Sequence, residues 1–480
     1  MITRIKINGF KSLVDTDLYL GPFTCIAGAN AIGKSNFFDA LVFLSHLADD
    51  TILQAVKAVR SENQKHSNVR DIFFRNGSEY LKEMSFEIDM IIPKISEDDL
   101  GQVAKATITS LKYCLKLRLN EDIDGEVVEI VSEELKPLTQ TETRKNIYFD
   151  YDKDWLNSVL YGRRSTRVPF ISVDDDKIKL HQDGSKGRTT DFIAKKMPRT
   201  LLSTVTAESP TAFLARQEIR NWTMLQFEPS ALRQPNSVYE VKNAEITANG
   251  LNLPATLYRL HSDKKDRDIY QILTNKLKGL VEDVNEITID KDEKRDLLTL
   301  QIGFKGGLIL PAQSLSDGTL RFLGLAIIEE DSMSSGLICL EEPENGINPK
   351  KVLEMVNLLK GMATDTDYPV DENNPLRQVI INTHSPIVVS AVPDESLYLA
   401  KSKESFIPQF NRKIKSTGFS ALKNTWKTKQ NLAEETTYGE ISAYLDNESS
   451  VQIVEEEIAI HTKKQRTVSQ NIISQYPLFQ

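Results

Sequence analysis

Residues 28 to 35 read Gly-Ala-Asn-Ala-Ile-Gly-Lys-Ser, a complete G-x-x-x-x-G-K-S phosphate-binding loop. A short apolar run precedes this loop over 23–27, and apolar residues at helical spacing follow it over 36–44. In a strand–loop–helix context the glycines let successive backbone N–H groups surround phosphate oxygens, and the helix N-terminus adds positive partial charge. We therefore predict that Lys34 contacts the β- and γ-phosphates and that the Ser35 hydroxyl binds Mg²⁺. The sequence thus predicts binding of a nucleoside triphosphate.

The length and charge of the chain exclude some classes of protein. Its 480 residues correspond to two or three folding units, and 59 Lys plus Arg against 68 Asp plus Glu give a net charge of −9, which excludes a uniform polycation. The cysteines Cys25, Cys114 and Cys339 are far apart, so we expect reduced, mostly buried thiols and no metal site built from cysteines. Residues 1–7 alternate like a strand rather than a signal peptide, and no apolar run approaches a membrane span. We expect a cytoplasmic protein without a membrane segment.

A second candidate site lies where an apolar run ends in acids. Residues 336–344 read G-L-I-C-L-E-E-P-E. Parallel strands that are buried on both faces read as continuous apolar runs, and ligands gather at their carboxyl ends. An acid there can hold Mg²⁺ and the next can polarise the attacking water. The alternative is a strand followed by a solvated acidic turn.

Two further segments have a similar form. Residues 314–321 read S-L-S-D-G-T-L-R before an apolar helix, so Ser316 or Asp317 would be the N-cap, and the first turn is either an anion site or only a cap. Residues 378–386 read Q-V-I-I-N-T-H-S-P, a core strand with His384 at its carboxyl end. A lone histidine after a strand is usually structural, but a position beside the other strand ends favours a functional role.

The order of these motifs resembles that of ABC-type ATPases, and more narrowly their soluble branch with RecF, SMC-type heads and OLD-like ATPases. Residues 7–13, I-N-G-F-K-S-L, resemble the entry strand and turn of that branch, and residues 340–349 resemble its E-P-E-N-G-I-H-P segment, with Asn348 where histidine is common. Residues 248–253 resemble a recurring piece of its small stand-alone members. The resemblance covers roughly 1–120 and 285–400 and implies an ABC-type P-loop head, with ATP and Mg²⁺ as ligands.

The resemblance also implies a role for individual residues. Glu341 would be a Mg²⁺ ligand together with Ser35, although an aspartate is usual at this position, so modest activity is expected. Glu342 would be the catalytic base, and His384 would contact the γ-phosphate. The residues that would bind the nucleotide are Gly28, Asn30, Gly33, Lys34, Ser35 and Asn36, with Ser316 and Gly318 from the signature motif.

In this family the signature motif completes the nucleotide site of the other subunit. Two chains should therefore sandwich two ATP molecules and separate after hydrolysis, as a dimer or a higher even oligomer. Asn345 and Gly346 fall in the turn that crosses to the partner. The glutamine that usually links the metal to the second lobe has no clear match, and Gln64 or the turn at 75–77 are candidates.

The sequence predicts an α/β fold in which a mixed sheet and an antiparallel β meander form the head. We expect an N-terminal lobe at 1–145, an inserted, mainly helical lid or arm at 146–284, a C-terminal lobe at 285–402 and a basic C-terminal extension at 403–480. The strands expected outside the motifs span 84–92, 111–119, 170–173 and 177–180; the expected helices span 201–214, 269–281 and 438–445. The core sheet is expected to end at 397–399. No sustained heptads indicate a coiled coil.

Basic residues gather in two stretches. The first holds Arg163, Arg164, Arg167, Lys186, Arg188, Lys195, Lys196 and Arg199. The second, 401–429, has eight cations and one acid, with Phe406 and Trp426 interleaved. Such a mixture binds a nucleic-acid backbone when its charge lies on one face, but it is also the composition of solvated surfaces, and both interpretations stay open.

The leading functional hypothesis is an ATP-hydrolysing switch. The chain resembles the stand-alone ATPase subunits of bacterial anti-phage defence systems such as Septu and PARIS, in which it would be the sensor or scaffold that controls a separately encoded nuclease or toxin. The alternative is a RecF-like repair ATPase that clamps DNA when ATP drives its dimerisation. A third hypothesis is an ATP-binding structural protein that hydrolyses slowly, as Glu341 in place of aspartate would allow.

Overall fold

The computed structural model describes residues 1–59, 68–98, 100–122, 125–162, 168–184, 189–263, 268–437 and 439–441. They form two compact units, and the chain passes between them more than once. The first unit contains Met1–Thr223, Asp365–Asp371 and Glu395–Thr437. The second contains Met224–Thr364 and Glu372–Asp394, with residues 439–441. The passage at Thr223 lies inside the predicted insert 146–284, whose limits stay a prediction.

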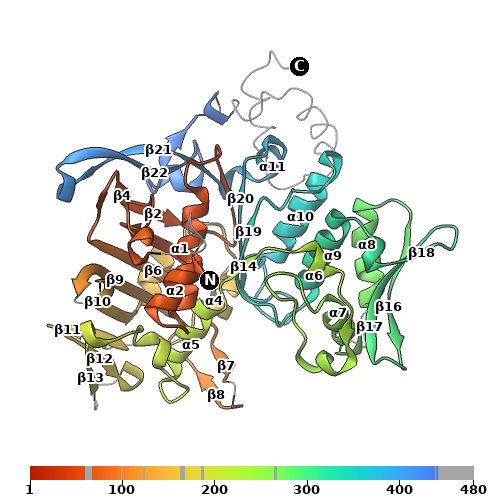
Figure 1. Ribbon diagram of the computed structural model, residues 1–480, viewed down its shortest axis with the longest axis horizontal. Helices are drawn as coiled ribbons and strands as arrows, with labels where there is room; N and C mark the ends of the chain where they lie inside the picture. The colour runs from red at the N-terminus through yellow and green to blue at the C-terminus, as the bar shows by residue number, and fades with distance from the viewer. Residues whose placement is uncertain are drawn as a thin grey trace. The chain divides into compact units, whose positions relative to one another are not determined.

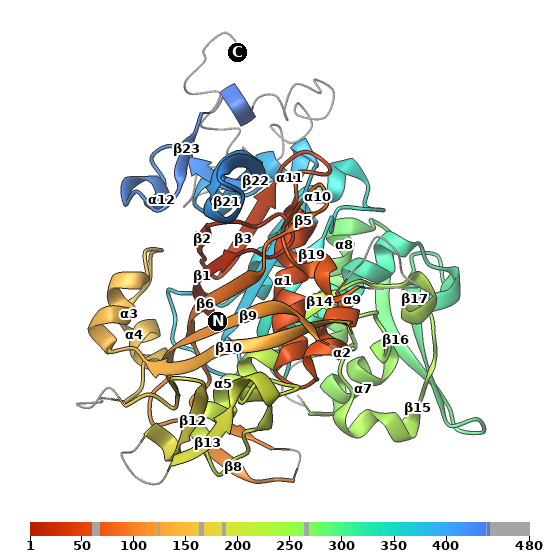
Figure 2. The same ribbon diagram turned by 60° about the vertical axis from the view of Figure 1, so that its left-hand side comes forward.

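An antiparallel sheet dominates the first unit. Its strand order is β13-β12-β11-β10-β9-β6-β1-β2, and Figure 2 shows β6, β9 and β10 side by side. The bounds are β1 Ile2–Asn8, β2 Thr16–Tyr19, β6 Glu83–Ile91, β9 Ser110–Asp122, β10 Gly125–Pro137, β11 Ile171–Asp174, β12 Lys177–His181 and β13 Thr189–Ile193. Met84 pairs with Leu117 and Val173 with Ile178, so the strands predicted at 84–92, 111–119, 170–173 and 177–180 are confirmed.

The core of this unit lies between the sheet and α1 (Lys34–Leu47), which follows the phosphate loop. Alternate residues of β6 are buried, and Phe86 meets Phe43 of α1 with ring centroids 6.0 Å apart. Phe10, just after β1, lies 5.7 Å from Phe43 and 5.8 Å from Phe86. Three buried rings therefore fix the helix of the phosphate loop on the sheet.

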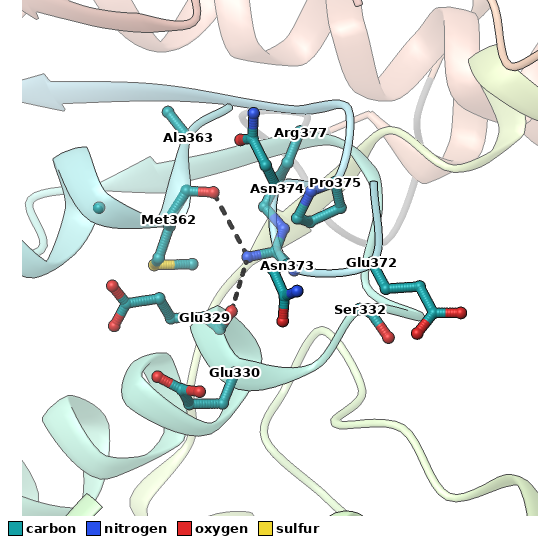
Figure 3. Close-up of a pocket in the computed structure, with 11 residues that line it drawn as sticks. Glu329, Glu330, Ser332, Met362, Ala363, Glu372, Asn373, Asn374, Pro375 and Arg377 are labelled. Atoms are coloured by element: carbon teal, nitrogen blue, oxygen red, sulfur yellow. Dashed lines mark hydrogen bonds between the residues drawn. The ribbon is translucent and has the colours of Figure 1, made fainter. Parts of the chain in front are cut away.

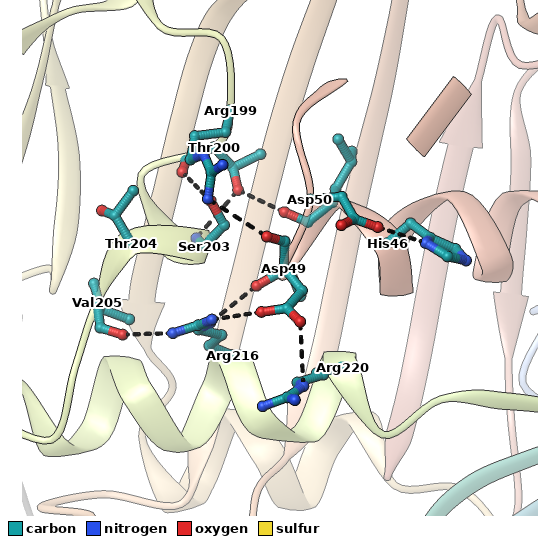
Figure 4. A network of polar contacts seen from close by, with 12 residues as sticks. His46, Asp49, Asp50, Arg199, Thr200, Ser203, Thr204, Val205, Arg216 and Arg220 are labelled. Carbon is teal, nitrogen blue, oxygen red and sulfur yellow. Dashed lines mark hydrogen bonds and ion pairs between the residues drawn. The ribbon is translucent and has the colours of Figure 1, made fainter. Parts of the chain in front are cut away.

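Polar contacts fix the other end of α1 (Figure 4). Arg216 of α5 (Pro210–Arg220) donates to the Ala48 and Val205 carbonyls at 2.9 and 3.0 Å, and its Nη2 lies 2.6 Å from Asp49 Oδ1. Arg220 Nε lies 3.5 Å from Asp49 Oδ2. Cations at a helix C-terminus complement its negative partial charge, so α5 stabilises α1 at the end opposite the phosphate loop.

The helix predicted at 201–214 is confirmed only over 210–214, and its first part is wrong. Residues Leu202–Thr204 form only a 3-10 turn, and α5 begins at Pro210. Ser209 is not helical, because a residue before proline is disfavoured in the helical region, whereas proline itself fits the first turn of a helix. The helix predicted at 269–281 is confirmed as α8 (Ile269–Leu280).

A second group of strands in the first unit begins with β3 (Phe23–Ala27), which is buried throughout. It pairs in parallel with β21 (Leu397–Ile407), β21 pairs antiparallel with β22 (Arg412–Leu422), and β22 pairs in parallel with β23 (Glu434–Thr436). The prediction that the sheet ends at 397–399 is therefore wrong. β21 and β22 form a hairpin, and Ile407 at its end belongs to a buried cluster with Val14, Phe74 and Leu81. The many lysines of this segment made its buried apolar residues hard to recognise from the sequence.

The second unit combines parallel strands with helices (Figure 1). β19 (Gly336–Glu341) pairs in parallel with β20 (Arg377–Thr383), and the register places Glu341 beside Asn382. β14 (Thr223–Leu225) is the other neighbour of β19. The helices are α6 Pro229–Leu232, α7 Leu253–Asp263, α8, α9 Asp317–Glu330, α10 Val352–Met362 and α11 Pro386–Ala391, and a small antiparallel sheet contains β15 Asn236–Ser237, β16 Val284–Asp292, β17 Leu297–Phe304 and β18 Ile309–Pro311.

The remaining elements of the first unit are short. They are α2 Ile52–Ala58, α3 Gln140–Asn146, α4 Lys153–Val159, α12 Trp426–Lys429, β4 Arg75–Asn76, β5 Glu79–Tyr80, β7 Ile95–Glu97 and β8 Val103–Lys105. The predicted α/β class, with buried parallel strands and an antiparallel sheet, is confirmed, whereas the region 146–284 combines helices with the strands β11, β12 and β13 of that sheet. Of the helix predicted at 438–445, residues 439–441 are helical and the rest lies outside the described residues. In the described part of the chain, no helix is both long and apolar enough to span a bilayer.

Candidate nucleotide-binding site

The phosphate loop has the predicted strand–loop–helix geometry. β3 ends at Ala27, the loop spans 28–33, and α1 begins at Lys34 with Gly33 as its N-cap. No side chain caps α1, and its first turn holds no acid. The N–H groups of a helix's first turn have no partner within the helix, so this end can receive an anion.

Gly33 is required by its surroundings as well as by its backbone. Its φ is 101°, in the left-handed region that side chains disfavour. A Cβ at this position would lie 2.5 Å from Ser12 Oγ and would also collide with Thr417 Oγ1. Any other residue would push the loop away from these two hydroxyls.

The side chains of the loop are divided between solvent and the protein. Ala29, Asn30, Ala31 and Ser35 are exposed, whereas Lys34 is buried. Its Nζ donates to the carbonyls of Gly28 and Ala29 at 2.5 and 2.9 Å, so the ammonium lies across the loop itself.

A pair of hydroxyls that the sequence did not indicate supports the loop from outside. Thr417 of β22 donates to the Ile32 carbonyl at 2.9 Å, and its Oγ1 lies 2.7 Å from Ser12 Oγ. Asn36 Nδ2 donates to the same Ser12 oxygen at 2.7 Å. Asn36, which we predicted to bind nucleotide, thus contacts the support of the loop here, and its contact with nucleotide stays a prediction. We call Ser12 and Thr417 the hydroxyl brace.

The predicted acids lie at the carboxyl end of β19 in the second unit. Glu341 is the last residue of the strand, and its Oε1 accepts a hydrogen bond of 3.0 Å from Asn382 Nδ2. Glu342 begins the following turn with φ 47°, and its N–H donates to the Asn382 carbonyl at 3.0 Å. Asn382 therefore holds the side chain of one acid and the backbone of the next, a role that its place in a core strand did not reveal.

Both oxygens of the Glu342 carboxylate have protein partners. His384 Nδ1 lies 2.6 Å from Oε1, and Asn345 Nδ2 donates to Oε2 at 2.9 Å. The structure thus brings together Glu342 and His384, which were singled out in separate motifs. Each side chain is partly exposed, so the pair is open to solvent.

A third acid, Glu344, supports the histidine from behind. Its Oε1 accepts a hydrogen bond of 2.5 Å from Thr383 Oγ1, which in turn accepts one of 2.9 Å from the Ser385 N–H. Burial raises the pKa of Glu344, and among the described residues its Oε2 has no partner. Glu344 and Thr383 therefore fix the backbone on both sides of His384.

The signature segment begins α9 close to the same turn. Ser316 is the N-cap, and its Oγ accepts a hydrogen bond of 3.2 Å from the Thr319 N–H, whereas Asp317 pairs with Arg233 at 2.6 Å. A Cβ on Gly318 would collide with the Gly346 carbonyl oxygen. Gly318 is therefore needed for the close approach of α9 to the turn after Glu342.

A separate polar pocket of about 240 Å³ lies near the start of β20 (Figure 3). Arg377 closes it from within: its guanidinium donates to the Ser334 and Asp331 carbonyls at 2.6 Å and to the Glu329 and Met362 carbonyls at 3.3 Å. This arginine fixes the ends of several segments, and the pocket includes none of the predicted site residues.

Several other predicted residues lie outside the part of the chain that the structure describes. Arg75 and Asn76 form β4 and Gly77 its turn, while Gln64 lies outside the described residues, so the linking glutamine stays unassigned. Of the first basic stretch, Arg163, Arg164, Arg167, Lys186 and Arg188 also lie outside them.

Comparisons with known proteins give one family. The model described as "AAA domain, putative AbiEii toxin, Type IV TA system" matches residues 23–390. No curated protein matches the chain.

Several solved structures are similar at low identity. An SmcHead bound to the C-winged helix domain of ScpA is 14% identical, with a TM-score of 0.45 over 88% of this chain and 98% of that one. The SMC head domain from Thermotoga maritima is 12% identical, with a TM-score of 0.37 over 88% and 99%. An Smc head with an extended coiled coil bound to the C-terminal domain of ScpA, from Pyrococcus furiosus, is 12% identical, with a TM-score of 0.43 over 90% and 99%.

Proposed function

The chain belongs to the family of AAA domains described as putative AbiEii toxins of type IV toxin–antitoxin systems. From this premise we propose that it is a Mg²⁺-dependent ATPase that acts as a switch. In this proposal it is the sensor or scaffold subunit of a bacterial anti-phage defence system and controls a separately encoded nuclease or toxin. The observation that carries the ATPase proposal is the phosphate loop, with its buried Lys34 and the uncapped start of α1.

The loop has the donor groups that a triphosphate needs. The first turn of α1 has no side-chain cap and contains no acid, so the partial positive charge of this helix end can receive a phosphate. Lys34 Nζ now donates to two loop carbonyls, and phosphate oxygens would offer this ammonium stronger, charge-assisted bonds. The residues present therefore fit a nucleotide.

Two oxygen ligands suit the metal ion. The exposed Ser35 hydroxyl and the Glu341 carboxylate are hard ligands of the kind that Mg²⁺ prefers, and they would hold it together with phosphate oxygens. When bound, Mg²⁺ would neutralise charge on the phosphates. Asn382 keeps one oxygen of Glu341 oriented, which limits the extra freedom of a glutamate where an aspartate is usual.

Glu342 and His384 supply the acid–base chemistry in this proposal. Glu342 would accept the proton of the attacking water, as a carboxylate placed after a strand can do. His384 lies within hydrogen-bond distance of that carboxylate and would contact the γ-phosphate, so it would link the phosphate to Glu342. Glu344 and Thr383 keep the histidine in place during this step.

The switch itself is the change between one chain and two. Ser316 is exposed at the N-terminus of α9, which suits contact with a phosphate held by a second copy, and the buried Gly318 holds this end of the helix against Gly346. ATP would then favour the closed dimer because each nucleotide contacts both chains, and hydrolysis would remove that difference in affinity. The defence role rests on the family description and on the resemblance of the motifs to such systems.

The alternative of a DNA clamp would need a basic surface, and in the candidate stretch 401–429 several cations are paired with acids. Lys401 and Lys403 lie 3.1 and 3.8 Å from oxygens of Glu434, and Arg412 pairs with Glu79 at 2.9 Å.

The count of eight cations also overstated the surface charge. Lys427 is fully buried, where its Nζ donates to the Glu395 carbonyl at 2.7 Å. The remaining exposed lysines are Lys413, Lys415, Lys423 and Lys429. No observation here favours the clamp over the switch.

The test uses Glu342→Gln, which removes the base but keeps the shape of the side chain. We expect ATP hydrolysis to fall by at least about 100-fold, and we expect the variant to retain ATP and remain dimeric in mass photometry. Glu282→Gln, an exposed acid outside the motifs, is the control. A pull-down from native cells should recover a nuclease or toxin. If DNA steeply stimulates hydrolysis and the pull-down recovers no effector, the switch is contradicted.

A further inference from the structure

The turn 342–346 joins the catalytic acid to the signature helix within the second unit. At one end Glu342 carries the carboxylate that meets His384. At the other end Gly346 approaches Gly318 of α9 so closely that a Cβ on Gly318 would collide with it. Asn345 lies between them: its side chain contacts Glu342, and its backbone carbonyl contacts Arg321 of α9. We call residues 342–346 the acid turn.

The side chain of Asn345 faces the acid. Its Nδ2 donates to Glu342 Oε2 at 2.9 Å, on the oxygen opposite the one that His384 contacts. A hydrogen bond to each oxygen restricts rotation of the carboxylate about its final bond, which is otherwise a broad torsion. The orientation of Glu342 therefore depends on Asn345 as well as on His384.

The backbone of Asn345 faces the signature helix. Arg321, in the second turn of α9, donates from Nη1 to the Asn345 carbonyl at 3.1 Å and from Nη2 to the Phe227 carbonyl at 3.5 Å. Its buried Nε has no partner among the described residues. A planar guanidinium held between two carbonyls transmits a displacement of α9 to the acid turn more directly than a flexible side chain would.

The turn does not need the Asn345 side chain to close. Its backbone is already fixed by the Asn345 N–H to the Glu342 carbonyl and by the Ile347 N–H to the Glu344 carbonyl, each at 3.0 Å. Gly346 takes the positive φ of 82° that the turn requires. The amide of Asn345 is thus left to act on the carboxylate alone.

We propose that Asn345 is a positioning residue for Glu342 and that Arg321 links it to the signature helix, so that engagement of α9 by the nucleotide of a second copy sets the orientation of the base. This inference rests on the proposed function and deepens it, because it names the path by which closure of the dimer reaches the catalytic acid.

The first test compares three substitutions at one position. Asn345→Asp keeps the size of the side chain and its tolerance of turns but replaces the donor with an acceptor, whereas Asn345→Gln keeps the amide. We expect Asn345→Asp and Asn345→Ala to lower kcat about 10- to 100-fold with KM for ATP within about twofold of wild type, and Asn345→Gln to recover part of the rate. A residue that served only the turn would tolerate aspartate, so a normal kcat for Asn345→Asp would overturn the proposal.

The control is Asn348→Ala, in the same connection. Asn348 Oδ1 accepts from the Lys350 N–H at 3.1 Å and caps the short helix that follows, without contact to Glu342. We expect its kcat to stay close to wild type. An equal loss of kcat in Asn348→Ala would mean that the whole connection, rather than the Asn345 amide, sets the rate, and this too would overturn the proposal.

The second test needs no catalysis. In the wild type, Mg²⁺–ATP should slow hydrogen–deuterium exchange in both the phosphate loop and the acid turn. In Arg321→Ala we expect the slowing to persist in the loop and to disappear from the turn, with Arg321→Lys intermediate. Slowing of both segments in Arg321→Ala would contradict the link.

The two proposals fail in different ways. If the wild type neither binds nor hydrolyses ATP, the proposed function fails. If the wild type hydrolyses ATP and Glu342→Gln abolishes turnover, but Asn345→Asp and Arg321→Ala behave as wild type, only the positioning role fails.

Discussion

Gly33 shows at the scale of one residue why the phosphate loop has its sequence. Alanine there would have to adopt φ 101° and would place a Cβ 2.5 Å from Ser12 Oγ. We expect Gly33→Ala to weaken ATP binding at least about tenfold and to lower the free energy of unfolding by about 1–3 kcal/mol. Gly306→Ala is the control, because Gly306 has φ 87° but no atom within 4 Å of its Cβ, so it carries backbone strain alone. Fluorescent-nucleotide titration and urea denaturation measure both effects, and equal losses of binding in the two variants would contradict the steric explanation.

Glu133 makes the stability of the first unit depend on pH. It is fully buried and accepts hydrogen bonds from the Leu201 and Leu202 N–H groups at 2.6 and 2.9 Å, yet burial raises its pKa from 4.5 to about 7. The folded protein therefore holds this proton more tightly than the unfolded chain. Its contribution to stability is fully present below pH 4.5 and is lost as the pH rises through about 7.

The substitution Glu133→Gln removes this titration. Between about pH 5 and pH 8 we expect the unfolding free energy of the wild type to fall by about 1–3 kcal/mol relative to the variant. Urea denaturation at the two pH values measures the difference. Glu134→Gln is the control, since Glu134 is partly exposed and pairs with Lys136 at 2.7 Å. Parallel pH curves for wild type and Glu133→Gln would mean that the carboxyl stays ionised when buried.

At the scale of elements, the hydroxyl brace connects β22 to the phosphate loop. Thr417→Val keeps the shape of the side chain but leaves the Ile32 carbonyl without the hydroxyl that donates to it at 2.9 Å. We expect a loss of about 1–2 kcal/mol in stability and an increase of several-fold in the Kd for ATP. Ser416→Ala is the matched control, because it removes a hydroxyl pair of 2.7 Å with Ser405 in the same hairpin without contact to the loop. A Kd unchanged by Thr417→Val would show that the loop holds its shape alone.

Elements that a few adjacent residues determine could be predicted from the sequence, whereas contacts between distant segments could not. The phosphate loop, the acidic strand end and the His384 strand were predictable because a few adjacent residues determine each of them locally. Ser12 and Thr417 were not, since their contact joins residues 405 positions apart. Burial of Lys427 was hidden for a related reason: its charge suggests a surface, whereas the Glu395 and Leu397 carbonyls and the Tyr398 ring, 4.1 Å from its Nζ, receive it inside.

At the scale of the whole molecule, the proposed dimer makes a prediction about mixtures of variants. Lys34→Ala disables the phosphate loop. Ser316→Asp keeps an N-cap on α9, because aspartate also caps helices, but places a negative charge where a phosphate would approach. Each variant alone should be nearly inactive. An equal mixture should recover about a quarter of the wild-type rate, because half of the dimers are mixed and each mixed dimer has one intact site of two.

The matched control mixes Lys34→Ala with Glu342→Gln. In the proposal both of these residues serve the nucleotide bound by their own chain, so every site in a mixed dimer carries a lesion and no activity returns. Recovery with Ser316→Asp but not with Glu342→Gln would assign the signature segment to the partner's site. If neither mixture recovers, the signature acts within its own chain or the chains do not exchange, and mass photometry of differently tagged chains separates these two outcomes. Assembly, rather than the single chain, is then the level at which the phosphate loop and α9 act on one nucleotide.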